Sequence, residues 1–477
     1  MKKLAICALA LGGFAASAQA ADLGLDSMKD PLPDQLTWNG VTVYGTIDVG
    51  YAYQTHGVSP SSGLATGLED SIWGSKNAKG SQSTLNNNGL SQSTIGVKVE
   101  EGIGMGWTAI GKVETGFNPL WGELSDGCAS LARNNGLNQV QQTTAQGDSS
   151  RCGQAFNGEV YAGVSNAGYG TLTVGRQNSL NLNTAANYDP MALSYAFSIL
   201  GYTGTVDGGG GDTELSRWDD SVKYVYQYGP VHASAMYSDG GNATGIFNGA
   251  YAGNVGATWK GFSVDAVYTK ERGAVSASNS TSLPFGSNQL VATLSDNEIW
   301  QVDGKYVWDL GGGYKDEGPG SKITFYGGYV HIDQANPSGG YSANPVTIGG
   351  YGLATVTTNN FATDKVLETA WAGAKYEVGP WAFTGAYYHV SQNSFLTGAH
   401  ATACTNAPTF VSGVKVDGHS SNCSGDFDQV AGLVDYTFNK HFDVYAGVTW
   451  QDISGGLASG YINTDNTFFM TGMRLKF

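Results

Sequence analysis

The stretch that decides the fold lies at residues 41–53 and reads Val-Thr-Val-Tyr-Gly-Thr-Ile-Asp-Val-Gly-Tyr-Ala-Tyr. Apolar side chains such as Val41 and Val43 occupy alternate positions, and polar side chains such as Thr42 and Asp48 lie between them. Successive side chains of a β-strand point to opposite faces. The stretch therefore predicts a strand with one apolar face and one mostly polar face.

The same period of two recurs along the chain in sixteen segments. Their ranges are 41–53, 91–100, 107–117, 158–165, 170–177, 220–228, 231–239, 251–260, 262–271, 297–309, 321–333, 365–378, 381–392, 426–438, 441–452 and 465–477. Short links follow the even-numbered segments, and long polar links follow the odd-numbered ones, as at 54–90, 118–157, 178–219, 272–296, 334–364 and 393–425. This alternation predicts an up-and-down meander with two unlike rims.

A barrel in a bacterial outer membrane has these features: an even strand number, short turns on one side and long loops on the other. Strands of about ten residues tilted by ~45° span a bilayer. Closure of the sheet leaves no unpaired edge in the hydrocarbon. We therefore expect an all-β fold, a 16-stranded antiparallel transmembrane β-barrel with short periplasmic turns and long extracellular loops. A soluble β-sandwich or a β-solenoid is the alternative, although neither calls for sixteen strands in regular hairpins.

Aromatic residues bracket several of the short links. The bracketing pairs are Trp259 and Phe262, Tyr376 and Trp381, and Phe438 and Phe442. Rings of this kind gather at membrane interfaces, so they predict one aromatic girdle. In the last segment Arg474 and Lys476 share one face, where lipid contact would cost roughly 2–4 kcal/mol each near the midplane. Both are therefore expected in the lumen or at the lower rim.

The composition agrees with a barrel and excludes several other classes of protein. The chain has 477 residues, 70 of them glycine, and only 13% are charged. With 12 prolines it is not a Pro-rich disordered chain. A formal net charge of −16 has the wrong sign for a nucleic-acid binder, so no nucleic-acid partner is expected. After residue 20, no apolar stretch approaches the ~20 residues of a membrane-spanning helix.

Residues 1–20 have the pattern of a secretory signal peptide. Lys2 and Lys3 precede an apolar run, and Ala18-Gln19-Ala20 forms a small-x-small cleavage site. The mature protein is expected to begin at Ala21, so that 21–477 make up the barrel. Because an exported protein enters an oxidising compartment, its cysteines are expected to form disulfides.

Four cysteines follow the predicted signal peptide: Cys128, Cys152, Cys404 and Cys423. They allow three disulfide connectivities, of which we favour the pairing of neighbours, Cys128 with Cys152 and Cys404 with Cys423. A metal site is the alternative, but the sequence has no Cys-x-x-Cys and no histidine at zinc-finger spacing.

No motif for catalysis is present in the sequence. The seven histidines are scattered without a His-Glu-x-x-His, and no Gly-x-Ser-x-Gly occurs. The glycine pattern at 102–106 joins two predicted strands, and the run at 208–211 lacks the Gly-Lys-Ser/Thr ending of a P-loop. We expect neither an enzyme nor a cofactor or metal.

Several of these segments together resemble the general trimeric porins of Gram-negative bacteria, most closely the betaproteobacterial type. They are the strand at 43–50, Gly-Thr-Leu-Thr-Val-Gly-Arg-Gln at 170–177, Ser-Val-Lys-Tyr at 221–224, and the terminal Phe477. The resemblance covers the mature chain. It implies a homotrimer in outer-membrane lipid, with a water-filled channel for passive diffusion of ions and small hydrophilic solutes. It also implies that Phe477 is part of the signal for membrane insertion.

In that family the third long loop, here about 178–216, folds into the barrel and narrows it. The resemblance places its acidic residues opposite basic residues of the wall, with Arg176 turned inward by a bend at Gly175. The predicted constriction residues are Arg176, Arg217, Lys223, Lys98, Lys112, Asp207, Asp212 and Glu214, the three lysines being assigned to the lumen by strand parity. Opposed fixed charges would set up a field across the opening and select solutes by charge and size. The loop lacks the Pro-Glu-Phe-Gly of enterobacterial members.

Two alternatives to a general diffusion channel stay open. One is a substrate-selective porin, and the other is an adhesin or receptor whose long loops bind a partner while the barrel acts as an anchor. The ion preference is also open. Acidic loops would concentrate cations at the mouth, whereas basic lumen residues act in the opposite direction.

Overall fold

The computed structural model describes residues 36–58, 75–138, 140–142, 151–201, 216–240, 249–279, 288–311, 320–338, 346–358, 361–395, 409–411, 414–416 and 423–477. The predicted signal peptide at 1–20 lies outside these ranges, as do Asp207, Asp212, Glu214 and Cys404.

Sixteen strands form a closed antiparallel barrel, and each of the sixteen predicted segments supplies one of them. The barrel strands are β2 (Val41–Gly57), β4 (Thr94–Gly104), β5 (Trp107–Asn118), β7 (Val160–Asn166), β8 (Gly170–Asn178), β9 (Arg217–Tyr228), β10 (Val231–Ser238), β11 (Ala250–Trp259), β12 (Phe262–Ser278), β13 (Gln289–Gly311), β14 (Ser321–Ala335), β17 (Lys365–Val378), β18 (Trp381–Gln392), β21 (Gly425–Asn439), β22 (Phe442–Ile453) and β23 (Asp465–Lys476). Consecutive barrel strands pair with one another, and β2 pairs with β23 to close the sheet. The prediction of the fold is confirmed.

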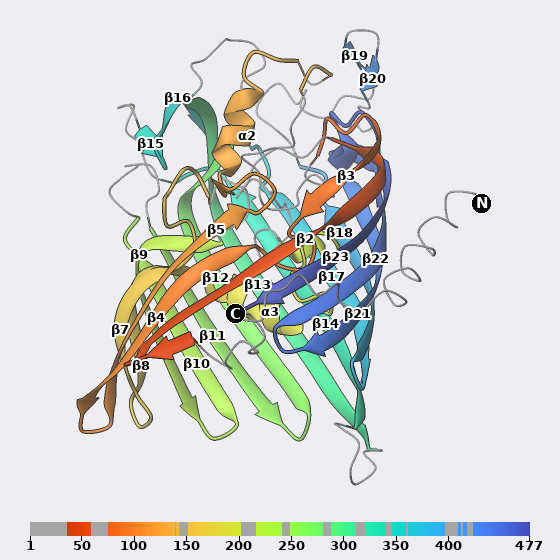
Figure 1. Ribbon diagram of the computed structural model, residues 1–477. Coiled ribbons are helices and arrows are strands. Elements are labelled where there is room, and N and C mark those ends of the chain that lie inside the picture. Colours follow the sequence, from red (N-terminus) through yellow and green to blue (C-terminus); the bar gives the residue numbers. More distant parts are fainter. Residues whose placement is uncertain are drawn as a thin grey trace.

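The two rims differ as the link lengths predict. The strands are tilted, with short turns at the lower end and long connections at the upper end (Figure 1). At one short turn Lys260 and Gly261 have φ angles of 49° and 85°. Two consecutive positive φ values suit the right-handed twist of the flanking strands, which is why two residues suffice to join them.

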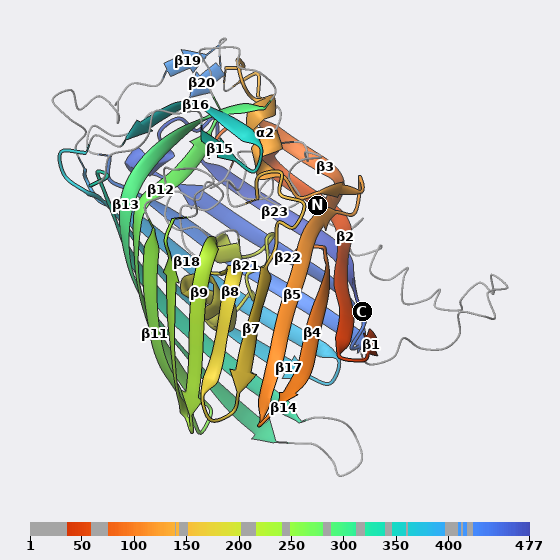
Figure 2. The same cartoon turned by 90° about the vertical axis from the view of Figure 1, so that its left-hand side faces the viewer.

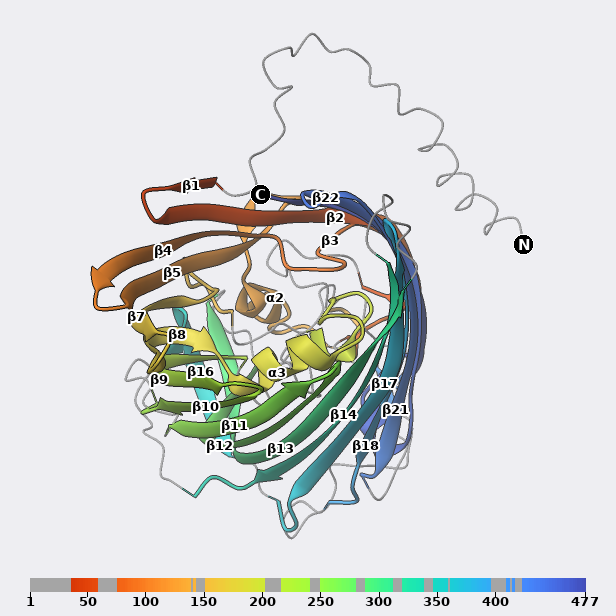
Figure 3. The same ribbon diagram turned by 90° about the horizontal axis from the view of Figure 1, so that it is seen from below.

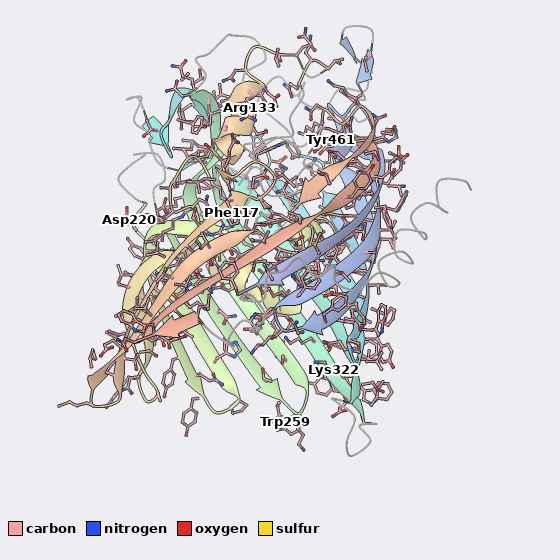
Figure 4. The ribbon with its side chains drawn as sticks, viewed as in Figure 1. Phe117, Arg133, Asp220, Trp259, Lys322 and Tyr461 are labelled. Atoms are coloured by element: carbon pink, nitrogen blue, oxygen red, sulfur yellow. A yellow bond between two sulfur atoms is a disulfide. The ribbon has the colours of Figure 1, made fainter. Side chains whose placement is uncertain are left out.

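Apolar side chains cover the outside of the barrel. Trp259 and Phe262 lie at the short-turn end with more than half of their surface exposed. Trp259 is labelled at the bottom of Figure 4. Around the same end, the Tyr436 ring contacts the rings of Trp381 and Phe438 edge to face. The predicted aromatic girdle is therefore present.

Smaller elements lie at the ends of the barrel and inside it. The short strands are β1 (Leu36–Trp38), β3 (Gly80–Asn87), β6 (Glu123–Leu124), β15 (Val346–Ile348), β16 (Tyr351–Thr358), β19 (Thr409–Val411) and β20 (Val414–Val416). The helices are α2 (Gly127–Arg133), α3 (Leu180–Tyr188) and the 3-10 turns η3 (Ile199–Gly201) and η4 (Gly455–Ala458). None of the helices in the described ranges is long and apolar enough to cross a membrane.

The prediction of a long link at 272–296 is wrong for most of these residues. β12 continues to Ser278, and β13 begins at Gln289, so the two strands form a hairpin well above the predicted ends. The inner side chains of this hairpin, including Val275 and Leu290, pack against α2 and the disulfide of Cys128 with Cys152. Burial against a second layer of loops extends the strands, a contact that the sequence pattern does not contain. Figure 2 shows α2 beside the upper parts of β12 and β13.

The disulfide between Cys128 and Cys152 is the one that pairing of neighbours predicts. Cys423 is also disulfide-bonded. The expected pairing of Cys423 with Cys404 concerns a residue outside the described ranges, and it stays a prediction.

Candidate channel constriction

The segment between β8 and β9, residues 178–216, is called here the inward loop. Its first element is α3, which lies inside the ring of strands when the barrel is viewed from below (Figure 3). The helix starts where Ser179 accepts a hydrogen bond from the Leu182 N–H at 3.1 Å. Such a cap satisfies one of the free N–H groups at a helix start. The chain thus turns into the lumen as a helix immediately after β8.

Neutral and acidic side chains of the wall fix α3 along β12 and β13. The Thr269 hydroxyl donates to Asn181 Oδ1 at 2.5 Å, and Asn181 Nδ2 donates to Gln301 Oε1 at 2.9 Å. At the other end of the helix, the Tyr188 hydroxyl donates to Asp265 at 2.5 Å. Thr269, Asn181 and Gln301 are all buried, so these bonds hold the helix against the wall without water between them.

Asp189 ends the helix and links the inward loop to the next part of the wall. Its fully buried carboxyl group accepts hydrogen bonds from the Tyr388 hydroxyl at 2.5 Å and from the Leu193 N–H at 2.7 Å. Trp371 Nε1 donates to the Tyr188 carbonyl at 3.1 Å beside it. Burial raises the pKa of Asp189, and the hydrogen bonds it accepts oppose that shift only in part. Asp189 is therefore an internal anchor of the loop and does not face the open lumen.

The inward loop continues across the barrel to β22 and β23. The Phe197 ring is fully buried and lies 6.3 Å from the Tyr445 ring and 6.1 Å from the Phe468 ring, between centroids. Gln429 Nε2 donates to the Phe197 carbonyl at 2.8 Å. A β-carbon on Gly447 would lie 2.5 Å from the Phe197 ring, so only glycine leaves room for it. The loop therefore crosses the lumen and packs on the far wall.

A set of charged side chains occupies the wall at β4, β5 and the start of β7. Lys112 Nζ lies 3.1 Å from Glu114 and 2.8 Å from Glu159. Tyr44 donates its hydroxyl to Glu114 at 2.9 Å. Lys98 Nζ lies 4.8 Å from the centre of the Tyr44 ring. Two of the three lysines that parity assigned to the lumen, Lys98 and Lys112, are thus neighbours on one face of β4 and β5.

Three more cations stand beside this set. Lys223 Nζ donates to the Asn178 carbonyl at 3.0 Å, and Arg151 donates to Gln92 Oε1 at 2.6 Å. Arg217 donates from Nη1 to Ser216 Oγ at 3.3 Å, and its Nε is enclosed without a hydrogen-bond partner within the described ranges. We call Lys98, Lys112, Arg151, Arg217 and Lys223 the wall cluster; its embedded carboxylates are Glu114 and Glu159.

Arg176 has a different environment. Gly175 has a φ of 138° and the ladder register shifts beside it, so the expected bend is present. The Arg176 guanidinium lies 2.7 Å from Asp219, whose side chain is 59% exposed, and it also donates to the Gly158 carbonyl. Asp219 and backbone oxygens therefore compensate this guanidinium, and we leave it out of the wall cluster.

Sequence reasoning missed residues on both sides of the lumen. Arg151 sits in a long loop, where strand parity gives no direction for a side chain. Asp265 and Asp303 are buried wall residues near α3, and the parity that assigned Lys98 to the lumen would have found them. In the part of the chain that the structure describes, no group of three or more potential ligands could hold a metal ion.

The inward loop and the wall cluster together make a lumen with two unlike sides. One side is filled by α3 and its hydrogen-bonded carboxylates, and the other presents cations in excess over carboxylates. Fixed charges that differ across a narrow aqueous passage create a field in which dipolar solutes align. The arrangement can sort solutes by charge and size without changing them chemically.

Comparisons with known proteins agree on one family. A model of the Gram-negative porin family matches residues 5–456. The anion-selective porin of Comamonas acidovorans has a similar structure, with a TM-score of 0.53 and 15% identity over 92% of this chain and 99% of that one. The trimer form of OmpT of Vibrio cholerae has a TM-score of 0.51 and 15% identity, again over 92% of this chain and 99% of that one. No match was found among curated proteins. At these identities the structural likeness shows the fold.

Proposed function

Since the chain belongs to the Gram-negative porin family and forms an outer-membrane channel for passive diffusion of solutes, we propose that the inward loop and the wall cluster form its constriction. The family and the fold indicate a channel rather than an enzyme. The finer proposal concerns which residues narrow the channel and how they act on a solute.

The observation that carries the proposal is the path of residues 178–201. This segment is anchored to β12 and β13 through α3, to β18 through Asp189, and to β22 and β23 through Phe197. Its packing on β12, β13, β18, β22 and β23 leaves the wall cluster on the other side of the lumen, where Lys98 is exposed and Arg151 and Lys223 are buried. Solutes therefore pass between the loop and a cationic surface.

The constriction favours anions along the wall cluster. Arg217 contributes to this preference, because no carboxylate oxygen of the described ranges lies within 4.0 Å of its guanidinium, while Glu114 and Glu159 pair with Lys112. We propose that the acidic residues Asp207, Asp212 and Glu214 of the same loop, which lie outside the described ranges, supply the opposing charge. A cation and an anion would then take different sides of one opening.

The proposal includes the assembly and the maturation of the chain. A homotrimer is supported by the Vibrio cholerae OmpT structure, whose fold this chain shares and which is described as a trimer form. Cleavage after Ala20 and a role of Phe477 in membrane insertion belong to the same proposal. The Phe477 backbone exchanges hydrogen bonds of 2.9 and 3.0 Å with Gly45, so the terminal residue completes the seam between β23 and β2.

Reversal potentials in a planar bilayer under a KCl gradient test the constriction. Arg217→Gln removes one cation from the wall cluster, and we expect the chloride-to-potassium permeability ratio to fall about 2-fold or more. Lys322→Gln is the matched control, because Lys322 pairs with Glu377 at 3.2 Å near the short-turn end (Figure 4). An unchanged ratio for Arg217→Gln, or an equal shift in both variants, would contradict the assignment.

A further inference from the structure

The disulfide between Cys128 and Cys152 closes part of the connection between β5 and β7 at the long-loop end of the barrel. The Gly127 N–H, next to one cysteine, donates to the carbonyl of Arg151, next to the other, at 2.8 Å. The covalent bond and the hydrogen bond thus join the same two points of the chain, and they fix the direction of the backbone at Arg151. We call these four residues the disulfide clamp.

The disulfide clamp is held in place by a small apolar core. Both of its cysteines are fully buried, and they pack with Leu131 of α2 and Leu290 of the β12–β13 hairpin. Tyr351 of β16 donates its hydroxyl to Asp126, the N-cap of α2, at 2.9 Å. Three separate connections contribute to this core, and α2 lies within the ring of strands in the view along the barrel (Figure 3). The clamp therefore has a fixed position over the lumen.

From the disulfide clamp, the Arg151 side chain reaches a gap in the row of lumen-facing residues on β5. Lys112 and Glu114 occupy two positions of this row, and the next position is Gly116. A β-carbon on Gly116 would lie 2.6 Å from Arg151 Nη1. The guanidinium therefore lies against the wall where β5 has no side chain of its own, and a loop residue supplies the charge at that position.

Neutral groups orient the Arg151 guanidinium. Arg151 Nη1 donates to Gln92 Oε1 at 2.6 Å, and Gln92 Nε2 donates to Ser125 Oγ at 2.9 Å. Asn157 Nδ2 donates to the carbonyls of Gly116 and Ser125 at 3.0 and 3.1 Å. A hydrogen bond to a neutral amide orients a guanidinium and does not cancel its charge.

We propose that the disulfide between Cys128 and Cys152 raises the anion preference of the channel by holding Arg151 in the lumen-facing row of β5. The clamped arginine adds its charge to the wall cluster beside Arg217, which is close enough for the two guanidinium charges to interact. Without the disulfide, the cysteines are 24 positions apart along the chain and the hydrogen bond at Gly127 alone joins them. The inference rests on the proposed function, because it requires the wall cluster to lie along the path of the solute.

Reversal potentials in a planar bilayer under a KCl gradient near 0.1 M test this role. Arg151→Gln, Gly116→Ala, and Cys128→Ala combined with Cys152→Ala should each lower the chloride-to-potassium permeability ratio about 2-fold or more. Gly116→Ala keeps the disulfide and displaces only the end of a flexible side chain. In the cysteine double variant, Arg151→Gln should have little further effect, because changes that act through one side chain do not add.

Two control variants and a change of salt separate charge from shape. Arg133→Gln removes an exposed cation from the last turn of α2 (Figure 4), and Gly111→Ala adds a methyl group on the opposite face of β5, 3.6 Å from the nearest atom. Both should leave the permeability ratio unchanged. In 1 M KCl the screening length falls to about 3 Å, so the effect of Arg151→Gln should shrink, whereas a change in pore shape would persist.

Reduction of the inserted wild-type channel with dithiothreitol tests the disulfide without a need for the cysteine variant to fold. The dithiol is oxidised to its cyclic disulfide, and Cys128 and Cys152 become thiols. The permeability ratio should then fall in the wild type and stay constant in Arg151→Gln. An equal fall in both proteins would assign the effect to another disulfide and overturn the inference.

The outcomes distinguish this inference from the proposed constriction. If Arg217→Gln lowers the ratio while Arg151→Gln or Gly116→Ala leaves it unchanged, the constriction stands and the role of the disulfide clamp is overturned. Equal shifts in Arg151→Gln and Arg133→Gln would overturn it too, as would an undiminished effect of Arg151→Gln in the cysteine double variant. If Arg217→Gln has no effect either, the proposed constriction itself is wrong.

Discussion

The carboxylates on the two sides of the lumen have different kinds of partner. On the side that α3 covers, Asp189 and Asp265 are held by hydroxyl, amide and imidazole groups and by backbone N–H groups. On the open side, Glu114 and Glu159 are held by the ammonium group of Lys112. Neutral donors fix a side chain in place, whereas a cation also cancels its charge.

In the proposed constriction, this difference would maintain an electric field across the aqueous lumen. The covered side needs an exact position for the inward loop, and directional hydrogen bonds from buried neutral groups supply it. On the open side Lys112 compensates Glu114 and Glu159, and in the proposed constriction the remaining cations of the wall cluster act on the solute. Each prediction below changes one side and leaves the other as it is.

The largest effect is expected on the open side from Lys112→Met. The change removes the shared partner of Glu114 and Glu159, whose side chains are only 14% and 11% exposed. Stranding buried charge costs roughly 3–5 kcal/mol, so the free energy of unfolding in urea should fall by about that amount. In Lys112→Met with Glu159→Gln, much of the loss should return.

Lys98→Met is the control for that experiment. Lys98 is exposed, and its contact with the Tyr44 ring is worth about 0.5–1 kcal/mol. A loss in Lys98→Met as large as in Lys112→Met would show that the open side responds to total charge and not to the paired carboxylates.

On the covered side, Gly447→Val should release the far end of the inward loop. The new side chain would occupy the space of the buried Phe197 ring, and overpacking of this kind costs about 1–3 kcal/mol. We expect a larger single-channel conductance, because the loop no longer packs on β22 and β23. Gly432→Val is the matched control on the neighbouring strand, where an added β-carbon meets no atom within 4 Å. Equal conductance in both variants would contradict the crossing of the lumen by the loop.

The open side was more predictable from sequence than the covered side. Alternation along 91–100 and 107–117 places Lys98 and Lys112 in the lumen, because a strand in a barrel has only two directions for its side chains. Arg151 was not predicted, since no such rule gives the direction of a side chain in a loop. It lies beside Cys152, and the disulfide with Cys128 brings that loop over the barrel.

The covered side depends on contacts between distant segments. The position of the inward loop inside the barrel was expected from resemblance alone, and its predicted site residues were acidic ones. The residues that place it are Phe197 and the wall groups Tyr388 and Gly447, which are far apart in sequence. No local pattern distinguishes a glycine that accommodates a ring from one that fills a lipid-facing strand, so the path of the loop required the structure.

The smallest effect concerns pH and the Asp189 anchor. Burial raises the pKa of Asp189 above the value of about 3.9 for an exposed aspartate. A group whose pKa is higher in the folded protein binds protons more tightly there, so its contribution to stability is complete below about pH 4 and declines as pH rises through the elevated pKa. Asp189→Asn keeps an oxygen that can accept from Tyr388 and Leu193 but does not titrate. We expect the melting temperature of Asp189→Asn to rise relative to that of the wild type as pH increases from 4 to 8. If the melting temperature of the wild type rises relative to that of the variant instead, the ionised carboxylate is the anchor. The covered side would then hold a charged carboxylate, as the open side does.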